Sequence, residues 1–85
     1  MVSEAALLRL LAAADLGRDD VVVEIGPGLG TLTGKLAERV RLVIALELDR
    51  TFLTVLAETC SGHRVSVVRG DALAVNFDDL VHRHT

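Results

Sequence analysis

A chain of 85 residues can form one small domain with a thin core, and its 51% content of hydrophobic residues argues against intrinsic disorder. Its only aromatic residues are two phenylalanines, so the core must be built from aliphatic side chains. The formal net charge is −3, and nine Lys and Arg are scattered among twelve Asp and Glu without a run of like charge. Because nucleic-acid binders usually present a basic face, any RNA-binding surface is expected mostly outside this stretch.

The sequence carries no sign of a membrane or secreted location. Its apolar stretches are far shorter than the roughly 20 residues that span a bilayer, and no signal peptide is visible. The single cysteine, Cys60, excludes an internal disulfide and is expected to be a packing residue. His63, His82 and His84 lack the spacing of metal ligands. We therefore expect a cytoplasmic chain with no membrane partner and no metal.

Apolar residues recur with helix and strand periods in alternation along the chain. A helix is expected from an N-cap at Ser3 to about Asp15, with Gly17 as its stop signal. The β-branched run Val21–Ile25 predicts a strand that is buried on both faces. The elements expected after it are a glycine turn at 26–30, a helix from 31 to about 39, a strand at 42–46, a helix from 50 to about 58 capped by Asp49, a strand at 65–68 and a final helical turn at 77–81 capped by Asn76.

This order of elements predicts an α/β fold. Strands separated by helices imply right-handed crossovers and a parallel sheet of the doubly wound type, of which these three strands would form the first half. A complete domain would need further strands after Thr85. In such a sheet the first strand lies between the second strand and a fourth. Without the fourth, Val21–Ile25 would form an apolar edge with no Lys or Pro, so the isolated chain is expected to self-associate through it or to exist only within a larger protein.

The stretch most informative about chemistry is the glycine turn Gly26–Gly30, with the sequence GPGLG. Such a turn between a strand and a helix lets the backbone approach a ligand closely, because no Cβ stands in the way. A dinucleotide site has the spacing G-x-G-x-x-G, but here Thr31 stands where the third glycine would be. Pro27 also lacks an N–H donor that a pyrophosphate could use. S-adenosylmethionine has no phosphate, so the turn favours this methyl donor, with a dinucleotide as the alternative.

Two carboxylates follow the later strands. Glu47 ends the second strand about 20 residues beyond the glycines, where an acidic residue commonly meets a ribose. Its two oxygens can accept from two adjacent ribose hydroxyls; a solvated charge at the strand end is the alternative. Asp71 leaves the third strand, where it can accept from the exocyclic amine of adenine, although a turn-forming Asp after Gly70 is the plainer interpretation. Glu24 lies on a buried strand and, as a charged group, needs a partner there.

Three motifs, Val23–Thr33, Ala45–Asp49 and Gly70–Leu73, together resemble the ribosomal RNA adenine N6,N6-dimethyltransferases. The resemblance covers nearly the whole chain, and its eleven-residue first motif is quite specific. That family dimethylates two adjacent adenines near the 3′ end of small-subunit ribosomal RNA. Its relatives, the erythromycin-resistance methylases, more often carry a lysine at the position of Leu29, so the chain is closer to the housekeeping branch.

The resemblance implies a Rossmann-like fold of the S-adenosylmethionine-dependent methyltransferases, here in part, with three parallel strands and flanking helices. It also implies which residues meet the donor: a glycine at its side, an acidic residue on its ribose, a second one on its adenine, and apolar walls around the adenine. In the order of the chain, these are Gly26, Gly28, Leu29, Glu47, Leu48, Asp71 and Ala72.

Parts of that family fall outside the 85 residues. Its Asn-Leu-Pro-Tyr motif, which holds the target adenine amine, would follow Thr85, as would a C-terminal helical domain that helps to grip RNA. We therefore expect residues 1–85 to be the cofactor-binding half of a class I methyltransferase domain, with no catalytic residue of its own and with small-subunit ribosomal RNA as the partner of the full-length protein. A non-catalytic S-adenosylmethionine-binding module and a fragment of a dinucleotide-binding oxidoreductase are the alternatives.

Overall fold

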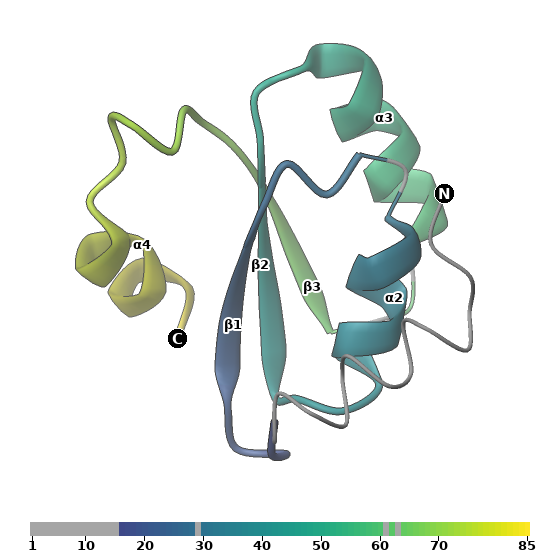
Figure 1. The fold of residues 1–85 in the computed structure, drawn as a ribbon, viewed down its shortest axis with the longest axis vertical. Helices are drawn as coiled ribbons and strands as arrows, with labels where there is room; N and C mark the ends of the chain where they lie inside the picture. Colours follow the sequence, from purple (N-terminus) through teal and green to yellow (C-terminus); the bar gives the residue numbers. More distant parts are fainter. Residues whose placement is uncertain (1–15, 29, 61, 63) are drawn as a thin grey trace.

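The computed structural model describes residues 16–28, 30–60, 62 and 64–85. Helices and strands alternate along this part of the chain, as the sequence predicts (Figure 1). The helix expected between Ser3 and Asp15 lies outside the described residues. The elements are β1 (Val21–Ile25), α2 (Thr31–Ala37), β2 (Leu42–Glu47), α3 (Arg50–Thr59), β3 (Val65–Arg69) and α4 (Phe77–His84).

The strands form one parallel sheet in the order β1-β2-β3. The middle strand, β2, is the most buried, and Val43, Ile44 and Ala45 have no exposed surface. Because successive side chains of a strand point to opposite faces, both faces of β2 must be covered. Helices α2 and α3 cover one face, and α4 lies on the other side of the sheet (Figure 1). The predicted α/β fold with a parallel sheet is therefore confirmed.

The core is aliphatic. A cluster of Leu36, Ala37, Val40 and Val43 joins α2 to β2, and half-buried aliphatic side chains pack around it. On the other side of the sheet, α4 buries Leu80, which is only 1% exposed. The low number of aromatic residues therefore leaves the packing to branched side chains that interdigitate between helix and sheet.

The helix ends are set by local hydrogen bonds. Asp49 caps α3 as predicted, since its carboxylate accepts from the N–H of Thr51 at 2.8 Å. Asn76 caps α4 by accepting from the N–H of Asp79 at 3.0 Å. This last helix continues to His84, three residues beyond the predicted turn. Its last turn is basic, and positive charge there complements the partial negative charge of a helix C-terminus.

Strand β1 lies at an edge of the sheet within the described part of the chain. The N–H of Gly26 donates to the carbonyl of Leu46 at 2.9 Å, and the N–H of Arg41 donates to the carbonyl of Asp20. In a parallel ladder alternate residues face the same neighbour, so the backbone groups of Val21, Val23 and Ile25 point away from β2. Within the described residues β1 is therefore an edge strand with backbone groups that no other strand pairs, and self-association through it stays a prediction.

We expect alanine to have opposite effects at Gly30 and Gly34. Gly30 has φ +85°, and a Cβ there would lie 3.0 Å from Leu56 Cδ2 and 3.1 Å from Cys60 Sγ, so Gly30→Ala should destabilise the fold by about 1–2 kcal/mol or more. Gly34 lies within α2 with open space around it, so Gly34→Ala should stabilise the fold by roughly 0.5–1 kcal/mol. Urea denaturation of both variants measures the difference, and a destabilised Gly34→Ala variant would contradict it.

Candidate functional site

The glycine turn connects β1 to α2 through backbone conformations that favour glycine. Gly26 and Gly28 have φ +65° and +60°, and a Cβ at either would meet nothing within 4 Å. The N–H of Gly30 donates to the carbonyl of Pro27 at 3.0 Å and closes the turn. The space beside Gly26 and Gly28 is thus open, and a ligand can approach the backbone there. Leu29, which the resemblance also places in the site, lies outside the described residues.

Glu47 brings the second strand into contact with this turn. It is only 8% exposed, and within the described part of the chain its carboxylate accepts three backbone hydrogen bonds. Oε1 accepts from the N–H of Gly28 at 3.2 Å, while Oε2 accepts from the N–H of Leu48 at 3.0 Å and from that of Asp49 at 3.1 Å. These donors compensate the cost of burying the charge. The structure therefore unites two of the predicted motifs, and the alternative of a solvated charge at the strand end does not hold.

Asp71 lies beside Glu47 along the carboxyl edge of the sheet. The N–H of Gly70 donates to the carbonyl of Glu47 at 3.1 Å and keeps the ends of β2 and β3 together. The side chain of Asp71 is exposed, and its Oδ1 accepts from the N–H of Leu73 at 2.9 Å. The turn-forming role is thus observed. It uses one carboxylate oxygen, which leaves Oδ2 able to accept from a ligand amine.

Apolar side chains are exposed at the same edge. Leu48, which the resemblance makes a wall of the adenine slot, is 57% exposed, and Ala72 is half-buried. Two further apolar side chains stand out there, Ile25 at 59% and Leu73 at 96% exposure. The sequence analysis singled out neither of them. Ile25 directly precedes Gly26 at the end of β1, and Leu73 directly follows Ala72 in the turn after β3.

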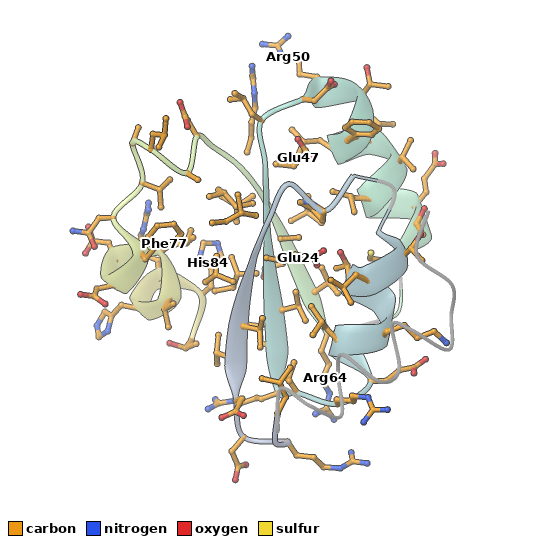
Figure 2. The ribbon with its side chains drawn as sticks, viewed as in Figure 1. Glu24, Glu47, Arg50, Arg64, Phe77 and His84 are labelled. Carbon is orange, nitrogen blue, oxygen red and sulfur yellow. The ribbon has the colours of Figure 1, made fainter. Side chains whose placement is uncertain are left out.

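A second, half-buried carboxylate, that of Glu24, lies beneath the turn. Thr33 Oγ1 donates to Glu24 Oε2 at 2.6 Å, which ties β1 to the first turn of α2 across the glycines. Figure 2 shows Glu24 between the sheet and α2, with Glu47 nearer the carboxyl end of the strands. Burial raises the pKa of the Glu24 carboxyl, and the hydrogen bond from Thr33 offsets only part of that rise. Glu24 therefore has the partner that the sequence analysis expects, and that partner is the hydroxyl of Thr33.

Cys60 packs below Gly30 and is 6% exposed. Burial raises the pKa of its thiol, and the negative charge of Glu24 raises that pKa further. A thiol that is held protonated is a poor nucleophile, which agrees with the expected packing role. Among the described residues, no group of three or more His, Cys, Asp or Glu could hold a metal ion. No helix in that part of the chain has the length and apolar character needed to cross a bilayer.

The comparison with known protein families decides the identity of this arrangement. The family model described as "Ribosomal RNA adenine dimethylase" matches residues 1–85. The chain belongs to the ribosomal RNA adenine dimethylase family. Within it, the chain is 54% identical over 80 residues to the ribosomal RNA small subunit methyltransferase A of Moorella thermoacetica, covering 92% of this chain and 28% of that protein. The chain thus spans little more than a quarter of that relative's length.

Solved structures share the fold. The chain resembles the dimethyladenosine transferase of Plasmodium falciparum with a TM-score of 0.79 and 31% identity, over 88% of this chain and 28% of the other. The 23S ribosomal RNA methyltransferase ErmE matches with a TM-score of 0.82 and 36% identity, over 89% and 32% of the two chains. A phosphoethanolamine N-methyltransferase of Haemonchus contortus, solved with S-adenosylhomocysteine, matches with a TM-score of 0.75 and 27% identity, over 82% and 15%. This chain of the dimethylase family therefore has part of the Rossmann-like methyltransferase fold.

We expect Glu24→Gln to remove a loss of stability that the wild-type protein shows as pH rises. In the unfolded chain the Glu24 carboxyl has its ordinary pKa of about 4.5, whereas burial raises the pKa in the folded protein above it. Between the two values the folded state binds more protons than the unfolded state, so the free energy of unfolding falls as pH increases through that window. Glutamine keeps an oxygen that accepts from Thr33 and carries no charge.

Denaturant titrations across this range of pH, from below the usual Glu pKa to neutral pH, measure the effect. The matched control is Glu58→Gln, which changes an exposed glutamate at the end of α3. The control should follow the wild-type pH profile, whereas Glu24→Gln should be flatter. Parallel profiles for all three proteins would show that the burial of Glu24 carries no such dependence.

Proposed function

We propose that this chain binds S-adenosylmethionine and forms the donor-binding part of an enzyme that dimethylates adenine N6 in small-subunit ribosomal RNA. The observation that carries the proposal is the 3.2 Å contact between Glu47 Oε1 and the N–H of Gly28. It brings a buried acceptor for ribose hydroxyls to the turn whose backbone is open to a ligand. Membership of the dimethylase family supplies the reaction and the RNA substrate of the proposal.

Each predicted site residue has a task in this proposal. The backbone at Gly26 and Gly28 lies along the donor, and Leu29, which lies outside the described residues, is the contact that the resemblance adds there. Glu47 accepts from the ribose hydroxyls, and Asp71 accepts from the adenine amine through the oxygen that its own turn leaves free. The exposed side chain of Leu48 offers an apolar surface to the adenine ring. The remaining apolar contact comes from Ala72.

The geometry of the turn favours S-adenosylmethionine over a dinucleotide. A pyrophosphate needs several N–H donors at the start of the helix that follows the glycines. Pro27 has none to give, and the N–H of Gly30 is already bonded to the carbonyl of Pro27. Thr31 begins α2 at the place of the third glycine of a dinucleotide site. A methyl donor without phosphate makes no such demand.

The chain's part in the reaction is to hold the donor. When bound, S-adenosylmethionine would supply an activated methyl group for transfer to adenine N6, and the residues of this chain would hold the donor in place. Correct placement of the two reactants supplies most of the rate enhancement of such a transfer. The 85 residues contain no Asn-Leu-Pro-Tyr sequence, which in the resembling family holds the target amine. We propose that the acceptor site belongs to other parts of the full-length protein, which also contact the RNA.

The chain should bind S-adenosylhomocysteine, the demethylated product, more tightly than NAD. The reason is the G-x-G-x-G spacing together with the missing N–H of Pro27. Isothermal titration of the purified chain with each ligand measures both affinities under the same conditions. Tighter binding of NAD would favour the oxidoreductase alternative.

Glu47→Ala should weaken binding of the donor by about 1.5–3 kcal/mol, the range for hydrogen bonds to a charged group. The matched control is Glu58→Ala, because Glu58 is an exposed glutamate on α3, away from the turn. Titration calorimetry of the two variants compares their affinities with that of the parent chain. Equal losses in the two variants would mean that Glu47 does not hold the ribose.

The 85-residue chain should bind the donor without transferring its methyl group to small-subunit ribosomal RNA. The physical reason is that no residue of the proposed site holds the amine of a target adenine. Transfer of label from the methyl group of the donor to RNA measures this, with a full-length family member as the positive control. Methylation by the chain alone would require an acceptor site within it. If the full-length protein that contains this chain were also inactive, the result would favour the non-catalytic module.

A further inference from the structure

The carboxylate of Glu47 has almost no capacity left for a ligand. An ionised carboxylate offers about four lone-pair sites. Three of them are occupied by the N–H groups of Gly28, Leu48 and Asp49. A ribose that presents two adjacent hydroxyl donors needs two acceptor sites. One of the three backbone donors must therefore give way before both hydroxyls can be accepted.

The bond from Gly28 is the one that can break most easily. Gly28 is 19 residues from Glu47 in the sequence, and its bond is the longest of the three at 3.2 Å. The other two donors are the residues that follow Glu47 directly, and both bond to Oε2. Asp49 is moreover fixed as the cap of α3. Only Oε1 can therefore lose its backbone donor without disturbing the start of a helix.

The surroundings of Gly28 allow this movement. There is open space around its Cα, and glycine reaches many backbone conformations without strain. The two ends of the turn stay anchored, because Gly26 donates to Leu46 at 2.9 Å and Thr33 donates to Glu24 at 2.6 Å. A rearrangement at Gly28 can therefore remain local.

We propose that Glu47 is a positioning residue for the glycine turn as well as a ligand of the ribose, and that the ribose displaces the N–H of Gly28 from Glu47 Oε1. Without a ligand, Glu47 holds the middle of the turn against the end of β2. On binding, Glu47 Oε1 accepts from the ribose hydroxyls instead, and the hydrogen bond from the Gly28 N–H is broken. This inference rests on the proposed binding of S-adenosylmethionine. The inference adds that a ligand without ribose hydroxyls leaves the hydrogen bond between Gly28 and Glu47 intact.

The test follows the Gly28–Glu47 hydrogen bond directly in the 85-residue chain. The chain is labelled with 15N and 13C. Scalar coupling between the Gly28 amide nitrogen and the Glu47 carboxylate carbon then reports the hydrogen bond that joins them. The ligands are S-adenosylhomocysteine and its 2′,3′-dideoxy analogue, and the Gly70 amide signal, next to Asp71, reports that each has bound. We expect the coupling in the free chain, its loss with S-adenosylhomocysteine, and its retention with the dideoxy analogue.

The other outcomes separate the two proposals. Saturation with S-adenosylhomocysteine while the coupling persists overturns the exchange and leaves the proposed function standing. Loss of the coupling with both ligands, or its absence from the free chain, also overturns the exchange. A chain that binds neither ligand overturns the proposed function, and the exchange with it. If only the dideoxy analogue fails to bind, loss of the coupling with S-adenosylhomocysteine supports the exchange, and its persistence overturns it.

Discussion

The burial of the Glu47 carboxylate at the end of β2 is the interaction on which the site depends. A charge that is only 8% exposed must be surrounded by donors, and three backbone N–H groups supply them. Two of these groups belong to the start of the segment that leads into α3, and the third belongs to the glycine turn after β1. The Glu47 side chain therefore joins the segments in which two successive crossover connections begin, one after β1 and one after β2. The position of the turn relative to the sheet follows from that junction.

A second carboxylate stabilises the same turn from below. Glu24 reaches Thr33 across the glycines, within a layer that is closed by α2 and α3. The two carboxylates differ in environment: Glu47 accepts from three backbone N–H groups, whereas Glu24 accepts from one hydroxyl and has a pKa raised by burial. The glycines between them carry no side chains that could anchor the turn by packing. The two acidic residues supply that anchoring, and they leave the face of the turn open.

The family and the fold agree with a site of this kind. The chain matches the dimethylase model throughout its length, and the fold recurs in solved structures of both a dimethyladenosine transferase and the 23S ribosomal RNA methyltransferase ErmE. Ile25 and Leu48 are exposed at the carboxyl ends of β1 and β2, and Leu73 is exposed in the turn that follows β3. In open α/β sheets the carboxyl ends of the strands are where ligands bind.

Sequence by itself determined the strands, the three helices that the structure describes and the two caps at Asp49 and Asn76, because hydrophobic period and capping chemistry act within a few residues. It also determined the family, through motifs that are contiguous. The sequence did not predict the full length of α4, which continues to His84, where the ring Nδ1 lies 2.8 Å from the carbonyl oxygen of Leu80. Only the tertiary structure decided that Glu47 bonds to Gly28. Those residues meet because β1 and β2 pair in one register, and no local pattern encodes which N–H groups a buried carboxylate will find there.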